Sequence, residues 1–266
     1  MLINDQSKYR LTDCTAQAIL ENGGGHADVA AEHRMDVYLN DRLAMRVVCT
    51  PEHLDELAVG RLLTEGLIRQ PGDIRTVFLC EWGTRAKIML SETAGAQLMD
   101  AETAAVSTCC TDNRMLLSSE RPLKPVRPAA WDPQWLLGIA ERMREEEPLY
   151  GKTHAVHACY LAEGERILCV REDIGRHNAL DKVIGWACIH EIDLGRCLLF
   201  TTGRMPADMV SKAIQCGVPV MASKTYPTDQ GIGLARQAKL TLVTVRPGGR
   251  IYVWNDGMKT AAEGTT

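Results

Sequence analysis

The chain has 266 residues, a formal net charge of −4 and 5% aromatic residues. A mildly acidic chain with few aromatic residues argues against nucleic-acid binding. Neither a secretory signal nor an apolar run of about 18 residues is visible, so we expect no membrane span and a cytoplasmic location. A chain of this length is long enough for two domains, each with its own core.

The first half of the chain predicts a tail followed by a small α+β domain. Residues 1–27 are polar, include three consecutive glycines and predict a flexible tail. We assign residues 28–125 to the N-terminal domain on three features: a hairpin over residues 37–48 that turns at Asn40 and Asp41, a helix with Thr50 as N-cap and Pro51 in its first turn, and strands over residues 74–80 and 85–90.

Residues 126–266 predict a second domain in which strands and helices alternate. The proline-rich stretch 121–128 is the candidate linker, and Asp132 and Pro133 begin a helix that ends in a solvated run, residues 145–147. Four apolar, strand-like segments follow, separated by helical patterns, at residues 167–170, 197–200, 218–221 and 240–245. Such alternation predicts a largely parallel sheet whose right-handed crossovers bring the loops after the strands to one edge. The fold class is therefore α/β, or α+β for the chain as a whole.

The most informative stretch is residues 171–186, where six polar or charged side chains surround one glycine. They are Arg171, Glu172, Asp173, Arg176, His177 and Asn178. An apolar, strand-like run precedes the stretch and a helical pattern follows it, so we expect the cluster where a strand ends and a helix begins. Ligands bind at such positions in open α/β sheets, and the first amides of a helix favour anions. The alternative is a mutually neutralising salt-bridge network at a surface turn.

The loops after the strands carry cations although the whole chain is acidic. These cations are Arg171, Arg176, Arg204, Lys224, Arg246 and Arg250. Convergent cations beside glycines and helix N-termini are typical of a site for a phosphate-bearing ligand. Each one taken singly is better explained as a surface charge, so the prediction depends on their shared position in the fold.

Ten cysteines in a chain without a secretory signal predict a reducing compartment and not a disulfide scaffold. Cys109 and Cys110 lie in a polar stretch, residues 106–113, that predicts an exposed loop. A thiol in such a loop can react as the thiolate, although two incidental loop cysteines are the simpler alternative. The absence of paired C-x-x-C motifs argues against a structural zinc ribbon, and His154 and His157 would point to opposite faces of a strand, so we expect no metal site. Six cysteines in apolar segments are expected to be small buried hydrophobes: Cys49, Cys80, Cys159, Cys169, Cys188 and Cys197.

Residues 171–182, R-E-D-I-G-R-H-N-A-L-D-K, closely resemble the signature of the formate dehydrogenase accessory proteins, the FdhD family. The resemblance extends over nearly the whole chain and includes residues 49–68, His157 with Ala158, and residues 202–212, 217–223 and 240–250. It implies that the second domain is a three-layer αβα unit similar to the cytidine deaminase fold without its zinc. The smaller N-terminal α+β domain would lie beside it.

Members of this family act as sulfurtransferases. The resemblance implies that Cys109 accepts sulfane sulfur as a persulfide from a cysteine desulfurase. The sulfur would then pass to the molybdenum cofactor, Mo-bis(molybdopterin guanine dinucleotide), before its insertion into the catalytic subunit of formate dehydrogenase. His177 or His157 would handle protons, and the family also suggests a homodimer. The expected cofactor-binding residues are Arg171, Asp173, Arg176, His177, Asn178, Gly203, Arg204, Val245, Arg246, Pro247, Gly248, Gly249 and Arg250.

The sulfur-carrying loop departs from the family pattern. The family's loop usually reads Ser-Ser-Cys-Gly-x-Cys-Gly, whereas residues 107–113 read Ser-Thr-Cys-Cys-Thr-Asp-Asn. Cys109 matches the first family cysteine, and Cys110 stands where a glycine is expected. Cys110 is the candidate resolving thiol, which would release sulfide and leave a disulfide. Two other functions remain open: a non-catalytic chaperone that delivers the guanylated cofactor, and a regulator that responds to guanine nucleotides.

Overall fold

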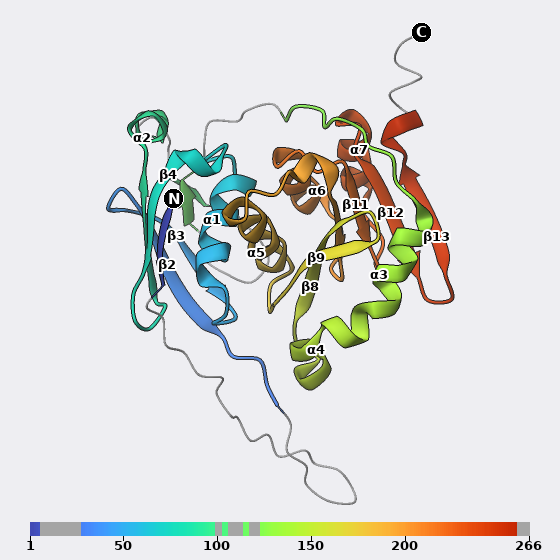
Figure 1. Ribbon diagram of the computed structural model, residues 1–266, viewed down its shortest axis with the longest axis horizontal. Coiled ribbons are helices and arrows are strands. Elements are labelled where there is room, and N and C mark those ends of the chain that lie inside the picture. The colour runs from blue at the N-terminus through green and yellow to red at the C-terminus, as the bar shows by residue number, and fades with distance from the viewer. Residues whose placement is uncertain (6–27, 99–102, 106–113, 117–122, 260–266) are drawn as a thin grey trace, which may run out of the picture.

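Two β-sheets lie on either side of a pair of packed helices, α1 and α5 (Figure 1). The computed structural model describes residues 1–5, 28–98, 103–105, 114–116 and 123–259. From one side to the other, the layers are the first sheet, α1, the helix layer containing α5, the second sheet, and α3. The predicted fold class, α/β or α+β for the chain as a whole, is therefore confirmed.

Within the described residues, the first sheet has seven strands in the order β1-β4-β5-β2-β3-β7-β6. The hairpin turn at Asn40 and Asp41 is confirmed, and both residues have the left-handed backbone that a two-residue hairpin turn requires. The first residues of the expected tail instead form an edge strand, and residues 6–27 lie outside the described part. The strands are β1 Leu2–Asp5, β2 His33–Leu39, β3 Arg42–Cys49, β4 Ile74–Leu79, β5 Arg85–Leu90, β6 Thr103–Ala105 and β7 Arg114–Leu116.

The second sheet has the strand order β13-β12-β11-β10-β8-β9 in the described part of the chain. Alternate residues of its central strands face two separate cores: Leu199, for example, packs with the α5 layer, while Phe200 packs toward α3. This alternation is the period-two burial expected of a sheet covered on both faces. The strands are β8 His157–Glu163, β9 Arg166–Asp173, β10 Leu198–Thr201, β11 Val220–Ser223, β12 Thr241–Arg246 and β13 Arg250–Asn255.

The helices cover both faces of the second sheet and one face of the first. None of those in the described residues is long and apolar enough to cross a membrane. The α-helices are α1 Leu54–Thr64, α2 Glu92–Leu98, α3 Pro133–Glu146, α4 Pro148–Thr153, α5 Arg176–Ile189, α6 Ala207–Gln215 and α7 Asp229–Gln237, and short 3₁₀ turns occupy Pro71–Asp73 and Leu194–Arg196.

The second sheet is mixed, so the expectation of a largely parallel sheet is only partly right. Strands β10, β11 and β12 are parallel, whereas β8 runs antiparallel to both β9 and β10. Strand β9 is thus the second half of a β8–β9 hairpin and lies at the edge of the sheet. It nevertheless points the same way as β10, because β8 reverses direction between them. The ends of β9, β10, β11 and β12 therefore reach one edge, as predicted.

Two local predictions were wrong, each because of a long-range contact. The helix expected to begin at Thr50 begins at Leu54, and the Thr50 amide instead donates to the Asp173 carboxylate at 3.0 Å. The acidic run ending α3 is not wholly solvated, since Glu147 is buried and accepts a hydrogen bond from the Tyr160 hydroxyl at 2.7 Å. Neither partner is near in sequence, so no local pattern could reveal the contact.

Helices α1 and α5 approach so closely that each needs a glycine at the contact. A Cβ atom on Gly60 would overlap the Asp181 carbonyl oxygen, and one on Gly185 would overlap the Glu56 carbonyl oxygen. The two glycines thus allow backbone-to-backbone packing, at the cost of their own conformational freedom. Buried charges lie beside this contact: Asp181 forms ion pairs with Arg61 and Lys212.

We predict that Gly185→Ala lowers the free energy of unfolding by about 3 kcal/mol, because the added methyl group must push the two helices apart. Gly138→Ala in α3 is the matched control, since a Cβ there meets no atom within 4 Å. The control should gain about 0.5–1 kcal/mol through the lower entropy of its unfolded state. Urea unfolding of both variants measures the two effects, and equal stabilities would contradict the close contact.

Candidate functional site

The candidate site lies at the carboxyl edge of the second sheet, where β9, β10, β11 and β12 end and β8 begins. We use "carboxyl edge" for His157 together with residues 174–176, 202–206, 224–228 and 246–249. Ligands of α/β proteins bind where strands end in this way. The topology therefore collects four loops, predicted separately along the chain, into one region.

Three helices begin at the carboxyl edge. Helix α5 starts at Arg176, α6 at Ala207 and α7 at Asp229, so their first backbone amides lie beside the strand ends. Helix N-termini carry partial positive charge and spare N–H donors, both of which favour anions. The position of these termini agrees with the sequence-based expectation of a phosphate-bearing ligand.

Gly203 holds two of the loops together. Its amide donates a hydrogen bond to the Thr201 hydroxyl oxygen at 3.1 Å, and its carbonyl accepts from the hydroxyls of Ser223 at 2.7 Å and Thr225 at 2.8 Å. A Cβ atom on Gly203 would lie 2.7 Å from the Cβ atom of Arg176. The glycine thus lets the start of α5 pack directly onto the loop after β10.

The pKa of His157 is affected by the cations of the carboxyl edge. The pKa of its imidazole is below the ordinary value, first because the ring is largely buried and then because Arg176, Lys224 and Arg204 act on it. These cations come from three different loops, and all of them are close enough to act on one imidazole. Three of the six cations named in the sequence therefore act on the same part of the carboxyl edge.

His177 and Asp208 form a pair at the starts of α5 and α6. The His177 Nε2 atom lies 2.8 Å from the Asp208 Oδ2 atom. Burial favours the protonated acid, but the hydrogen bond and charge of His177 outweigh it and hold the pKa of Asp208 below its usual range. Asp208 thus fixes the orientation of the ring, which is the arrangement used to position histidines that handle protons.

The turn between β12 and β13 combines glycines, arginines and nearby aromatic rings. Gly248 and Gly249 have positive φ angles, and Arg246 donates from Nη1 to the Lys224 carbonyl at 2.9 Å. The Arg246 guanidinium lies 5.5 Å from the centre of the Tyr226 ring. Tyr226 in turn packs edge-on against Tyr252 and Trp254, and the sequence analysis did not identify these rings. Their only signal was the spacing of Tyr252 and Trp254, which puts both on one face of a strand.

Three of the predicted ligand-binding residues have different partners in the structure. Arg171 turns toward α1, where its Nη2 atom lies 2.7 Å from the Glu56 carboxylate. Asp173 is fully buried and forms an ion pair with Lys182 at 2.7 Å. Asn178 donates to the Val48 carbonyl at 2.8 Å. These three side chains join the two sheets, so for them the structure supports the alternative reading of a salt-bridge and hydrogen-bond network.

Cys109 and Cys110 lie outside the described residues. Of the described cysteines, six have thiol pKa values raised by burial, to about 11 for Cys188 and Cys197 and to about 12 for Cys169. Burial also raises the pKa of Cys49, Cys159 and Cys216. Cys80 differs from its predicted buried state: it is partly exposed, and hydrogen bonds, including one with Thr84, outweigh burial and lower its pKa.

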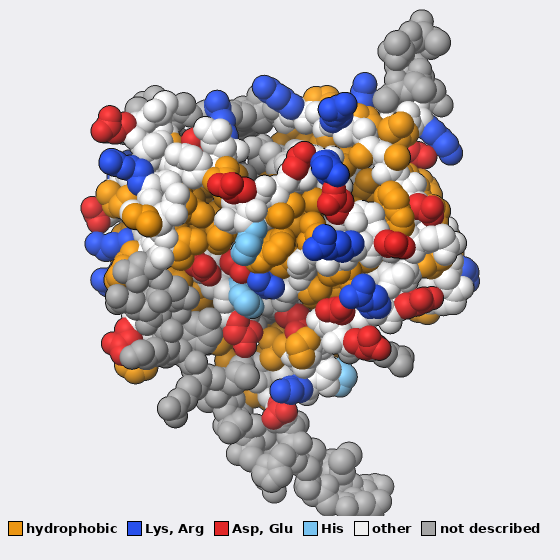
Figure 2. Space-filling model, viewed as in Figure 1, with side chains coloured by type: hydrophobic (Ala, Val, Ile, Leu, Met, Phe, Trp, Pro, Cys, Tyr) orange, Lys and Arg blue, Asp and Glu red, His pale blue; other side chains and the backbone are white. Residues whose placement is uncertain are grey.

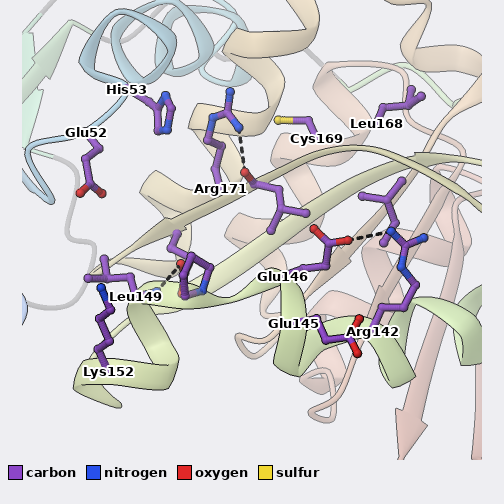
Figure 3. A pocket seen from close by; sticks show the side chains of 14 residues that line it. Glu52, His53, Arg142, Glu145, Glu146, Leu149, Lys152, Leu168, Cys169 and Arg171 are labelled. Carbon is purple, nitrogen blue, oxygen red and sulfur yellow. Dashed lines mark hydrogen bonds and ion pairs between the residues drawn. The ribbon is translucent and has the colours of Figure 1, made fainter.

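A groove lies along β9 and is lined by residues 167–172 of that strand. This groove has a volume of about 690 Å³ and is formed by β9, α3, α4 and the segment before α1 (Figure 3). Figure 2 shows the face of the molecule drawn in Figure 1, where acidic and basic side chains are interspersed among apolar ones over the second sheet and α3. Strand β9 runs along the groove and ends at the carboxyl edge.

The fold and the carboxyl edge define an α/β protein whose cations and helix N-termini gather where the strands of one sheet end. The model of the FdhD/NarQ family matches residues 30–260, and the chain belongs to that family. Similar proteins named "Sulfur carrier protein FdhD" include one from Listeria innocua and one from Bacillus licheniformis. The one from Listeria innocua is 29% identical over 86% of this chain and 90% of its own length, and the one from Bacillus licheniformis is 30% identical over 82% and 83%.

A solved structure shares the fold. A protein from Desulfotalea psychrophila, described as a formate dehydrogenase accessory protein, superposes with a TM-score of 0.73 at 27% sequence identity. The match covers 91% of this chain and 95% of the other. Both sheets therefore belong to an architecture already seen in a formate dehydrogenase accessory protein.

We predict that Arg204→Gln raises the pKa of His157, because one of the positive charges that disfavour the imidazolium is removed. The exposed Arg196, which pairs with Glu163 before β10, provides the control, and Arg196→Gln should leave the His157 pKa unchanged. An NMR titration of the His157 imidazole measures both. In the parent protein, bound pyrophosphate should also raise this pKa, and no shift in any of these cases would contradict a shared cationic edge.

Proposed function

We propose that this chain is a sulfur carrier that supports formate dehydrogenase by delivering sulfur to a guanylated molybdenum cofactor. The observation that carries the proposal is the carboxyl edge, where cations from separate loops and three helix N-termini converge. The family membership and the names of the similar proteins support the general role.

The cargo that we propose for the carboxyl edge is Mo-bis(molybdopterin guanine dinucleotide). Its two pyrophosphates suit Arg176, Arg204 and Lys224 together with the amides at the helix starts. The Arg246 turn and the neighbouring Tyr226 ring offer stacking and cationic contacts to a guanine. We therefore propose residues 245–250, which the sequence also predicts as part of the cofactor site, as the guanine-binding segment.

Cys109 is the proposed site of the persulfide. A sulfur carrier attacks as a thiolate, and burial keeps six of the described cysteines in the thiol form near neutral pH. In the proposed step, the Cys109 thiolate attacks the outer sulfur of the persulfide on a cysteine desulfurase. The donor's sulfur–sulfur bond breaks, its cysteine leaves as a thiolate, and a new sulfur–sulfur bond forms on Cys109.

The second candidate function is a chaperone that binds and delivers the guanylated cofactor without carrying sulfur. The altered loop favours it, because Cys110 stands where the family has a glycine and the second cysteine of the usual pattern is displaced or absent. Both functions use the carboxyl edge in the same way. They differ in whether a persulfide forms on the loop.

We predict that incubation with a cysteine desulfurase and cysteine adds one sulfur atom to the peptide that contains Cys109 and Cys110. Mass spectrometry should show that Cys109→Ser abolishes this adduct. Cys80→Ser is the matched control, since Cys80 is partly exposed and has a lowered pKa, and it should leave the adduct intact. An adduct that is lost in Cys80→Ser but kept in Cys109→Ser would overturn the assignment.

We predict that Arg204→Gln weakens GDP binding at least about tenfold, because charge-assisted contacts to phosphate contribute about 1.5–3 kcal/mol each. Arg196→Gln again serves as the control and should bind GDP as the parent does. Isothermal titration calorimetry measures both dissociation constants. Equal loss in the two variants would point to a general charge effect, and no loss in either would remove Arg204 from the site.

A further inference from the structure

Strand β9 has hydrogen-bonded strand neighbours on one side only among the described residues. It pairs with β8 and ends the second sheet. The groove of about 690 Å³ is lined by six consecutive residues of this strand, 167–172 (Figure 3). Because the backbone groups of a strand point alternately to its two sides, those not directed at β8 face outward along this groove.

Two backbone carbonyls of β9 accept hydrogen bonds from side chains of the protein itself, and that of Glu172 accepts from Thr50 and Lys182. The Val170 carbonyl accepts its hydrogen bond from the Arg171 side chain, at 2.8 Å from Nη1. Ile167, Leu168 and Val170 are only partly buried. Natural edge strands are commonly covered or carry charges in their middle. Here residues 167–170, in the first half of the strand, are apolar, whereas the second half is charged.

Most charges that line the groove are paired within the protein. Arg142 pairs with Glu146, Arg171 pairs with Glu56, and the Glu172 carboxylate accepts the amides of residues 149 and 150. Each of these groups is therefore already satisfied in the free protein. They shape the groove but leave little charge for an incoming partner.

Two carboxylates in the groove have no ion pair with any described residue. Glu52 lies in the segment before α1, on one side of β9, and Glu145 lies on α3, on the other side (Figure 3). Lys152 of α4 is the one lining cation in the described part that is not paired in this way. The groove thus presents two carboxylates against one amine, which favours basic side chains on whatever lies along β9.

We infer that β9 is a docking edge, on which an extended segment of the recipient molybdoenzyme adds as a further strand to the second sheet. That segment has apolar side chains at its centre and Lys or Arg at its flanks, facing Glu52 and Glu145. Strand addition supplies affinity through backbone hydrogen bonds, and the flanking charges supply selectivity. The inference rests on the proposed function, because it names the partner that collects the cargo.

The direction of β9 favours the recipient molybdoenzyme over the sulfur donor as the partner. Eight residues of strand extend about 26 Å, and β9 leads from the groove straight to the start of α5 at the carboxyl edge. An enzyme held along β9 is therefore aligned with the edge that we propose for its cofactor. A sulfur donor has no need of that edge, since it delivers to the Cys109 loop.

The first test is hydrogen exchange of the full-length protein with and without the apo-form of the recipient formate dehydrogenase subunit. We expect slower exchange of the amides of residues 167–170 in the complex. Protection confined to other strands, or no complex at all, would overturn the inference. If the same amides became protected when the concentration of the protein alone was raised, β9 would bind a second copy. If the desulfurase protected them, β9 would bind the sulfur donor. Either result overturns the choice of partner.

The second test is a double charge reversal, Glu52→Lys with Glu145→Lys. We expect the dissociation constant for the apo-subunit to rise about tenfold, because like charges replace opposite charges at both flanks. Glu141→Lys is the control, since Glu141 is exposed on the same helix but does not line the groove. Persulfide loading and GDP binding should be unchanged in the double variant. If the parent protein showed neither persulfide loading nor GDP binding, the proposed function would be contradicted, whichever way β9 behaves.

Discussion

The backbone contact between α1 and α5 is the constraint on which the rest of the structure depends. It requires Gly60 and Gly185, and it brings Asp181 against Arg61 and Lys212 in a buried cluster. Burial favours the neutral acid, yet the two cations outweigh it and hold the pKa of Asp181 below its usual range. Removing one member of such a cluster costs about 3–5 kcal/mol, because the remaining charge stays buried. The two sheets are thus fixed relative to each other by shape and by charge.

This constraint divides the charged signature of residues 171–182 between two tasks. Asp173, Asp181 and Lys182 face inward and connect α5 to the first half of the chain. Arg176 and His177 lie at the start of α5, on the carboxyl edge. One short segment therefore sets the position of the site and also contributes to it. The first half of the chain, through Thr50 and Glu56, holds the strand and helix that carry these residues.

Strand β9 runs along the groove and ends at the carboxyl edge. Residues 167–172 line the groove formed with α3 and α4, and the end of the strand leads into the helix that begins at the carboxyl edge. The ion pair between Asp173 and Lys182 fixes the end of the strand beside α5. A partner bound along the strand therefore lies next to the carboxyl edge without any large rearrangement of the protein. The fold in this way offers a surface for a protein partner beside a site suited to a phosphate-bearing cargo.

Several features were determined by the sequence alone because they depend on local chemistry. Periodicity gave the hairpin at Asn40 and Asp41 and the capped start of α3 at Asp132, and strand–helix alternation gave the shared edge of the loops. The tertiary structure decided which charges are available to a ligand. Asp173 and Asn178 look like site residues in the sequence, but their partners Lys182, Thr50 and Val48 are identified only by the fold. The same holds for Tyr226, whose neighbours Arg246 and Tyr252 come from other strands and loops. A side chain's role depends on which distant groups desolvate it or pair with it, and only the folded chain brings those groups together.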